Sequence, residues 1–226
     1  MIAVDSIMID WVTDLKAQLL NIVLKKAYIR SKIPFKLASG KTSFDYVDMR
    51  CGLSNGNDLK VACLYLAETL KASGYDFATN IFTDETSMSK SFTDNRSSTD
   101  ATHKNNILIT SVGGMTMGAD PISHGVSLLT GINWFSVRKQ SKDHGTQNSI
   151  EGYKISNSDS VLLVDDTVTS GTSLIKAAQQ VLSTGASIKI AVCILDRSTL
   201  AKSEFEKLGI RYIPLLTFED LKIEPV

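Results

Sequence analysis

Five short runs of apolar residues constrain the fold of this chain more than any other feature. Each run is rich in Ile, Val and Leu and is bounded by Gly, Asn, Asp or Ser. The runs occupy residues 107–112, 132–137, 161–164, 188–195 and 210–216. Helical patterns lie between most of them, at residues 119–130, 172–184 and 199–208. Short, fully apolar strands that alternate with helices predict an α/β fold with a parallel sheet covered on both faces.

The N-terminal part of the chain predicts a helix, a hairpin and a second helix. Apolar residues recur at three- and four-residue spacing through residues 7–30, which is typical of an amphipathic helix. Residues 35–50 alternate in polarity, which favours a strand or a hairpin. Asp58 is expected to cap a helix that runs through Lys71, and Gly74 stands where a C-cap glycine belongs.

Residues 79–106 do not fit this alternating pattern. Of these 28 residues, 18 are Ser, Thr, Asp or Asn, so the segment cannot bury enough apolar surface to offset its ordering entropy. We interpret it as a mobile surface insertion; a regulatory or partner-binding arm is the alternative, and nothing in the residues selects it. The 226 residues predict one domain, with a core that needs no disulfide or metal.

The composition excludes several classes of protein. Lys and Arg together number 24, as do Asp and Glu, so binding of nucleic acid by bulk charge is disfavoured. Three cysteines, far apart and in or near apolar runs, predict reduced core thiols in a cytoplasmic protein. The acidic N-terminus is unlike a secretory signal, and no apolar run approaches the ~18 residues of a membrane span. His103 and His124 have no partners at metal-ligand spacing, so we expect no structural metal site.

The stretch that carries the chemistry is residues 161–173. Four apolar residues predict a buried strand, Asp165 and Asp166 stand at its carboxyl end, and a loop bearing hydroxyls and a glycine then opens a helix. Ligands bind at the carboxyl ends of parallel strands, and the N–H groups at a helix N-terminus favour an anion. A phosphate therefore fits at residues 169–173, and the carboxylates suit a vicinal diol one sugar length away. The alternative is an ordinary strand-to-helix turn with an acidic N-cap.

A second stretch concentrates positive charge in a chain whose total charge is zero. Arg138, Lys139, Lys142 and His144 lie within seven residues, and Gly145 follows as a pivot. Such a loop is by itself most often a solvated, charged surface segment. Because the chain also carries the phosphate site described above, we interpret the loop as a focused trap for an anion.

Residues 161–173 resemble the phosphoribosyl-pyrophosphate signature of the type I phosphoribosyltransferases. The resemblance implies that Asp165 and Asp166 hold the ribose 2′- and 3′-hydroxyls, and that residues 169–173 cradle the 5′-phosphate. The cationic loop resembles the mobile catalytic loop of orotate phosphoribosyltransferases, with its Arg-Lys-x-x-Lys-x-His-Gly core. The donor-binding residues implied are Arg138, Lys139, Lys142, His144, Asp165, Asp166, Thr167, Val168, Thr169, Ser170, Gly171, Thr172 and Ser173, and the catalytic ones are Lys142, Asp143 and His144.

Three further stretches are similar to the orotate family. Residues 39–50 resemble its orotate-side segment, residues 112–121 its pyrophosphate loop with the following helix, and residues 195–197 the site of an arginine that meets the orotate carboxylate. The orotate-binding residues implied by the resemblance are Lys41, Tyr46, Thr169 and Arg197.

The chain departs from many members of the family at two places. Those members carry lysines where Ala38 stands and near Thr116 and Met117. One branch of the family lacks both lysines, and this chain resembles that branch more closely. We expect Lys41 or Lys36 to take over part of their role.

The resemblance implies the reaction of orotate with phosphoribosyl pyrophosphate, which gives orotidine 5′-monophosphate and pyrophosphate in pyrimidine (UMP) biosynthesis. Magnesium would come with the diphosphate and be held mainly by the substrate, with no direct protein ligand. In the family the mobile loop reaches the neighbouring subunit's site, so the resemblance implies a homodimer. It also implies a single phosphoribosyltransferase domain over residues 1–226, with a central parallel sheet flanked by helices and an N-terminal hood at about residues 1–50.

Two other functions stay open. A transferase for another base would keep the phosphate and ribose site and differ at residues 38–47 and at Arg197. A regulator that senses phosphoribosyl pyrophosphate without turnover would not need the intact cationic loop and would usually carry a separate basic DNA-binding segment. This chain has the intact loop and shows no such basic segment in its sequence. We therefore expect small-molecule substrates as partners, with no nucleic acid and no membrane.

Overall fold

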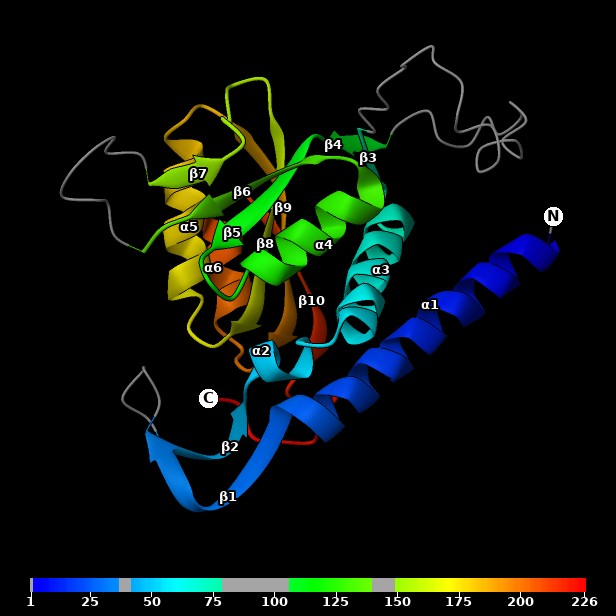
Figure 1. The fold of residues 1–226 in the computed structure, drawn as a ribbon, viewed down its shortest axis with the longest axis vertical. Helices are drawn as coiled ribbons and strands as arrows, with labels where there is room; N and C mark the ends of the chain where they lie inside the picture. Colours follow the sequence, from blue (N-terminus) through cyan, green and yellow to red (C-terminus); the bar gives the residue numbers. More distant parts are fainter. Residues whose placement is uncertain (1, 37–41, 79–105, 140–148) are drawn as a thin grey trace.

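The computed structural model describes residues 2–36, 42–78, 106–139 and 149–226. Its centre is a six-stranded sheet in the order β10-β9-β8-β5-β6-β7 (Figure 1). All pairings in it are parallel except that of β7 with β6, so the predicted parallel sheet is confirmed. The strands are β5 (Ser111–Met115), β6 (Asn133–Val137), β7 (Ile150–Gly152), β8 (Ser160–Val168), β9 (Ser187–Asp196) and β10 (Arg211–Thr217).

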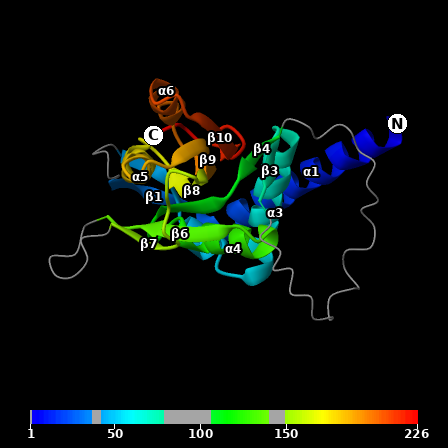
Figure 2. The same ribbon diagram turned by 90° about the horizontal axis from the view of Figure 1, so that it is seen from above.

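Helices cover both faces of this sheet, as the alternating pattern predicts (Figure 2). One face packs against α1 (Ile2–Ile22), α3 (Gly56–Ala72) and α4 (Asp120–Thr130). The other face packs against α5 (Thr172–Leu182) and α6 (Ala201–Lys207). The apolar run of β8 has no polar alternation because both of its faces are buried. Leu162 and Val164 lie in the first core, and Val161 and Leu163 lie in the second.

Strand β8 is longer than the apolar run that predicts it. Pairing with β9 continues past Val164, with Asp165 opposite Cys193 and Thr167 opposite Leu195. The polar residues keep the extended conformation because the neighbouring strand supplies hydrogen-bond partners for their backbone. The acid pair therefore lies within β8, near its C-terminal end, rather than after the strand.

The first helix ends earlier than its apolar spacing predicts. A single π-helical turn, η1 (Val23–Ala27), follows α1, and the chain then enters β1 (Tyr28–Lys36). The expected helix is wrong from Tyr28 to Arg30, because these residues pair with β2 (Thr42–Val47) in an antiparallel hairpin. The hairpin, at the lower end of Figure 1, confirms the hairpin expected in residues 35–50.

The short helix α2 (Met49–Gly52) and then α3 follow the hairpin. Asn55, not Asp58, caps α3, because its side chain accepts a hydrogen bond from the backbone N–H of Asn57 at 2.9 Å. Asp58 lies inside the first turn and forms an ion pair with Lys26. Gly74 follows the helix with φ of 86°, so its predicted role as a C-terminal glycine is confirmed.

The apolar run at residues 107–112 contributes to two sheets. Strand β4 (Ile107–Ile109) pairs with β3 (Tyr75–Phe77) in a small parallel sheet, and β5 begins after Thr110. Residues 79–105 of the predicted insertion lie outside the described residues.

Two of the three cysteines lie in the core as predicted, and one does not. Cys63 and Cys193 are buried, whereas Cys51 on α2 is exposed, so the prediction of a core thiol is wrong there. None of the helices in the described ranges is long and apolar enough to cross a membrane.

Candidate active site

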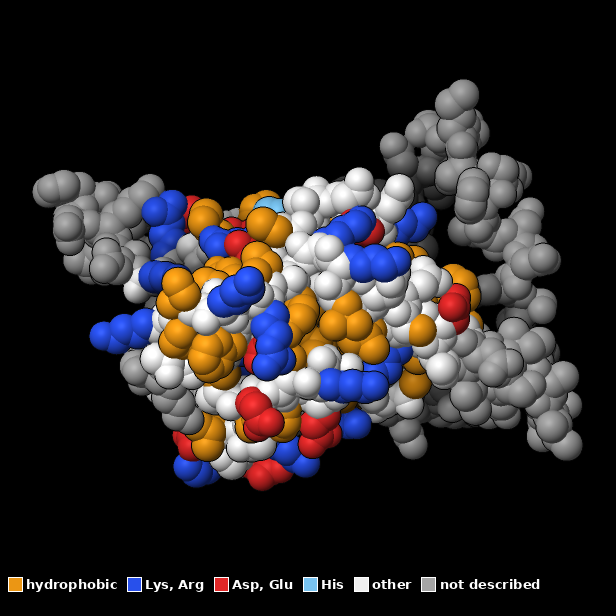
Figure 3. Space-filling view, turned by 90° about the horizontal axis from the view of Figure 1, so that it is seen from below, with side chains coloured by type: hydrophobic (Ala, Val, Ile, Leu, Met, Phe, Trp, Pro, Cys, Tyr) orange, Lys and Arg blue, Asp and Glu red, His pale blue; other side chains and the backbone are white. Residues whose placement is uncertain are grey.

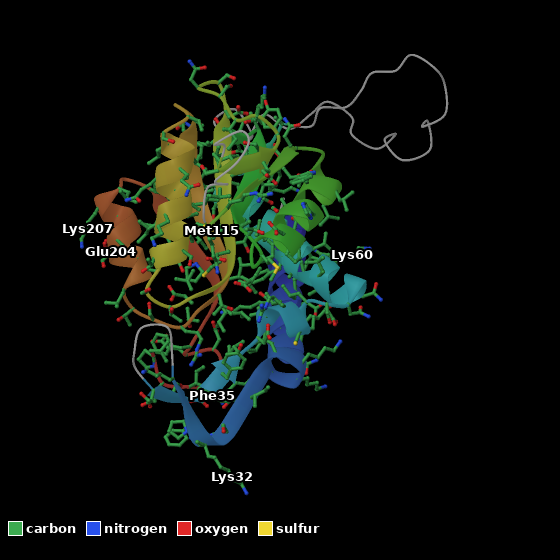
Figure 4. All side chains as sticks on the ribbon, turned by 60° about the vertical axis from the view of Figure 1, so that its left-hand side comes forward. Lys32, Phe35, Lys60, Met115, Glu204 and Lys207 are labelled. Atoms are coloured by element: carbon green, nitrogen blue, oxygen red, sulfur yellow. The ribbon has the colours of Figure 1, made fainter. Side chains whose placement is uncertain are left out.

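A cavity of about 260 Å³ opens at the carboxyl edge of the central sheet. Its walls come from the hairpin and α2 on one side and from the ends of β5, β6 and β8 on the other. The lining residues are Tyr46, Val47, Asp48, Met49, Arg50, Met115, Thr116, Met117, Gly118, Lys139, Asp165, Asp166, Thr167 and Ser173. In Figure 4, Met115 lies in the interior above Phe35 of the hairpin, while Lys32, Lys60 and Lys207 mark the outer surface.

The predicted acid pair lies in this cavity. Asp165 is only 7% exposed, and burial raises the pKa of its carboxyl group well above the usual range. The neighbouring charge of Asp166 raises that pKa further, because two close carboxylates resist ionising together. Burial also raises the pKa of Asp166, against the hydrogen bond from the Thr167 N–H at 2.6 Å and the attraction of Arg50. Hydroxyl groups of a ligand can satisfy both carboxylates here.

The loop after β8 has the geometry of a phosphate site. Gly171 adopts φ of 77°, which favours glycine, and leads directly into α5 at Thr172. The hydroxyls of Ser170 and Thr172 lie 2.9 Å apart on this loop. The first N–H groups of α5 and these hydroxyls together suit an anion. Ser173 of the same turn lines the cavity.

A glycine-rich turn brings the end of β5 against the acid pair. A side chain at Gly114 would collide with the Val164 carbonyl oxygen of β8, and one at Gly118 would lie 2.6 Å from the Asp166 carboxylate. The turn includes a cis peptide bond between Thr116 and Met117. The Thr116 hydroxyl donates to Asp120 at the start of α4 at 2.6 Å. The turn predicted as a pyrophosphate loop therefore lies directly beside the acid pair.

The cationic loop is described only at its two ends. Lys139 lines the cavity, as predicted for a donor-binding residue. Arg138 forms an ion pair with Glu151 at 2.6 Å and lines a neighbouring cavity of about 460 Å³ instead. Lys142, Asp143 and His144 lie outside the described residues, so their catalytic roles stay predictions.

The predicted orotate arginine lies beneath the hairpin. Arg197 is 3% exposed, its Nη2 donates to the Ser43 hydroxyl at 3.4 Å, and burial lowers its pKa. Among the described residues its Nε–H has no hydrogen-bond partner, which is uncommon for a buried donor. Tyr46 lines the main cavity, and Lys41 lies outside the described residues.

Two charged cavity residues were not predicted as site residues from the sequence. Asp48 and Arg50 follow the end of β2 and line the cavity opposite the acid pair. Both lie in residues 39–50, the segment that resembles the orotate side of the family, but the resemblance gave no role to either side chain. Thr167 was predicted, and the structure adds that its buried Oγ1 lacks a partner within the described part of the chain.

The cavity also suits a divalent cation that shares its ligands with a substrate. Carboxylate oxygens are the donors that magnesium prefers, and Asp165 and Asp166 supply them. In the described ranges no three His, Cys, Asp or Glu side chains could enclose a metal ion by themselves. The side chains present therefore fit a cation that is bound largely through the ligand.

Comparisons with known proteins agree with this geometry. Residues 106–217 match the phosphoribosyl transferase domain family. Orotate phosphoribosyltransferase of Methanosphaera stadtmanae is 30% identical over 93% of this chain and 98% of its own length, and that of Methanocaldococcus jannaschii is 29% identical over 92% and 98%. The crystal structure of Mycobacterium tuberculosis orotate phosphoribosyltransferase in complex with phosphoribosyl pyrophosphate has a TM-score of 0.65 and 25% identity, covering 92% of this chain and 99% of that one. By its fold, its site and these relatives, the chain belongs to the orotate phosphoribosyltransferase family.

Proposed function

We propose that the protein transfers the 5-phosphoribosyl group of phosphoribosyl pyrophosphate to orotate, with orotidine 5′-monophosphate and pyrophosphate as products. The observation that carries the proposal is the acid pair of β8, next to a phosphate loop on one side and a glycine-rich turn on the other. A relative at 30% identity over nearly its full length has the same activity in its name. The reaction belongs to pyrimidine biosynthesis.

Different residues bind different groups of the donor. Asp165 and Asp166 accept hydrogen bonds from the ribose hydroxyls, and residues 169–173 hold the 5′-phosphate at the start of α5. The reaction separates charge, because the anomeric carbon becomes cationic as the pyrophosphate departs. Lys139 from the end of β6, together with the predicted Arg138, Lys142 and His144, places positive charge on the leaving group. Magnesium, bound mainly by the substrate, would neutralise part of the diphosphate charge.

Orotate would lie between the hairpin and the end of β9. Tyr46 lines the cavity there. The buried Arg197 is the predicted partner of the orotate carboxylate. Thr169 and Lys41 are the other predicted orotate contacts. The hairpin covers this side of the site and restricts access of water to the reacting carbon.

The assembly and its location follow from the same proposal. We expect a cytoplasmic homodimer in which Lys142 and His144 of one subunit complete the site of the other, whereas Lys139 lines the site of its own subunit. The absence of a spanning helix from the described ranges is compatible with this location.

A base-specificity assay tests the proposal. Purified protein with phosphoribosyl pyrophosphate and magnesium should consume orotate and release pyrophosphate, while uracil, adenine and hypoxanthine react far more slowly. Preferential use of another base would identify a different transferase. Tight donor binding without turnover of any base would identify a sensor.

A further inference from the structure

We propose that Arg50 binds the diphosphate of the donor and that Asp48 holds its guanidinium in position. The inference rests on the proposed function, since it names a further residue for the same reaction. Arg50 lines the cavity, and an ion pair holds its guanidinium although the side chain is 54% exposed.

Asp48 orients Arg50 through both of its carboxylate oxygens. Arg50 Nε donates to Oδ1 at 3.1 Å and Nη2 donates to Oδ2 at 3.2 Å. The same Oδ1 accepts the backbone N–H of Arg50 at 3.1 Å, which caps the start of α2. A guanidinium has five N–H donors, and this side-on pairing uses two of them. Three donors remain for a ligand, in the planar arrangement that suits phosphate oxygens.

The position of Arg50 in the cavity points to the diphosphate rather than to the 5′-phosphate. The 5′-phosphate site lies after β8, at residues 169–173, and the acid pair fixes where the ribose lies. The diphosphate must then extend from the ribose away from that loop, toward the turn at residues 115–118. Arg50 is close enough to Asp166 to lower its pKa, and a Cβ atom at Gly118 of that turn would lie 2.6 Å from Asp166 Oδ1.

The charge balance of the cavity supports the same assignment. Among the described residues, its lining has three carboxylates, those of Asp48, Asp165 and Asp166, and two cations, Lys139 and Arg50. The turn at residues 115–118 supplies backbone N–H groups but no charged side chain. A donor with several negative charges therefore has Arg50 as one of its two side-chain counter-charges in the described part of the cavity.

The contacts of Arg50 support a binding role better than a purely structural one. The cap of α2 uses the backbone N–H of Arg50 and not its guanidinium, so a substituted side chain keeps the cap. An ion pair this exposed contributes little to folding stability because solvent screens it. Substitution should therefore change ligand binding while leaving thermal stability within a few degrees of wild type.

The test compares Arg50→Gln and Arg50→Lys with Arg211→Gln as a matched control. Arg211 is an exposed arginine at the start of β10, at the opposite edge of the sheet, where it donates to the Ser73 carbonyl. Isothermal titration measures the affinity of each variant for phosphoribosyl pyrophosphate, inorganic pyrophosphate, ribose 5-phosphate and orotate. Unfolding midpoints measure whether each variant is folded.

We expect Arg50→Gln to lower the affinity for phosphoribosyl pyrophosphate and for pyrophosphate roughly 10- to 100-fold, the usual effect of losing hydrogen bonds to a charged group. Ribose 5-phosphate, which lacks the diphosphate, should change less than about twofold, and Arg211→Gln should behave as wild type. Arg50→Lys should recover only part of the affinity, because an ammonium keeps the charge but loses the planar fork. Asp48→Asn, which keeps an acceptor for the cap, should weaken donor binding less than Arg50→Gln.

Unchanged affinity of Arg50→Gln for phosphoribosyl pyrophosphate would overturn the proposal. An equal loss for ribose 5-phosphate would also overturn it, since Arg50 would then act on the other phosphate or on the shape of the site. A loss confined to orotate would place Arg50 on the base side and would refute the diphosphate role. If wild type binds the donor but does not turn over orotate, the proposed function fails, while the diphosphate-selective loss still supports Arg50.

Discussion

Asp165 and Asp166 carry a cost for folding, and we propose a role in binding for them. Burial at the end of β8 raises the pKa of both carboxyl groups, and the charge of Asp166 raises the pKa of Asp165 further. Their hydrogen bonds within the chain are short-range contacts to backbone N–H groups, at 3.0 Å for Asp165 and 2.6 Å for Asp166. A buried acid pair with so little compensation is typical of a functional site.

The double variant Asp165→Asn with Asp166→Asn should bind the donor much more weakly while it folds normally. Each lost hydrogen bond to a charged acceptor typically costs ~1.5–3 kcal/mol. Titration of phosphoribosyl pyrophosphate into the folded variant measures this loss, with orotidine 5′-monophosphate as a second ribose ligand. Near-normal affinity for both ligands would remove the acid pair from the ribose site.

The same variant should gain stability relative to wild type as the pH rises. The folded-state pKa of each carboxyl lies above the unfolded value, so wild type binds more protons when folded and loses stability between those two pKa values. Asparagine cannot ionise and does not take part in this loss. Urea unfolding of the ligand-free proteins from pH 4 to pH 8 should show a stability difference that grows in favour of the variant. A difference that is constant with pH, or that grows in favour of wild type, would contradict the raised pKa values.

Two segments that connect strands of the fold lead to predictions about function. The cationic loop joins β6 to β7, and its two ends are held together by the hydrogen bond from the Arg138 N–H to the Ser149 carbonyl at 2.8 Å. The polar segment joins β3 to β4, which pair in parallel. Both segments therefore start and end on ordered strands, so each can be altered without breaking the central sheet.

Lys142→Ala should lower the turnover rate much more than it weakens orotate binding. A leaving pyrophosphate needs positive charge most in the transition state, and loss of one well-placed donor lowers rates by ~10²–10³ in other enzymes. Steady-state kinetics and orotate titration separate the two effects. Unchanged turnover would exclude Lys142 from catalysis.

Mixing Lys142→Ala with the Asp165→Asn, Asp166→Asn variant tests whether the loop acts across a dimer interface. Each mixed dimer would contain one site with an intact acid pair and an intact borrowed loop, so activity should return. Native mass spectrometry checks that mixed dimers form. Mixed dimers without activity would place Lys142 in the site of its own subunit.

Replacement of residues 80–105 by a Gly/Ser linker of eight residues should change stability only modestly. Closure entropy varies slowly with loop length, by ~0.6 kcal/mol per doubling. The linker must return from Phe77 to Ile107, whose strands pair over three residues, so a short connection is sufficient. Urea unfolding measures the change, and failure to fold would show that the segment is a structural element. Loss of activity in a folded variant would support a functional arm.

The charge of the whole molecule is balanced, but its distribution is uneven. Figure 3, the view onto the hairpin end, shows several Lys and Arg side chains among hydrophobic ones, with acidic side chains mainly toward the lower edge. Strand β1 contributes exposed Arg30, Lys32 and Lys36 to this end of the molecule. Local positive charge near the site attracts anionic substrates even when the net charge is zero.

Sequence reasoning succeeded where the determining interactions are local. The strands and helices of the sheet follow from apolar periodicity, which burial on two faces imposes on each segment separately. The acid pair and the predicted phosphate loop are contiguous, so residues 165–173 contain most of the proposed ribose 5-phosphate site. The departures at the ends of elements, such as the strand at Tyr28 and the cap at Asn55, arose where a distant partner or a competing neighbour decided the outcome.

The sequence by itself determined the α/β class, the order of the strands along the chain and the position of the acid pair and the glycine-bearing loop at the carboxyl end of β8. Only the tertiary structure decided which other side chains face them. Arg50 enters the cavity because α2 packs above the end of β8, and Arg197 lies beneath a hairpin that begins about 170 residues earlier. Such placements depend on contacts between segments far apart in the chain, and local periodicity carries no information about them.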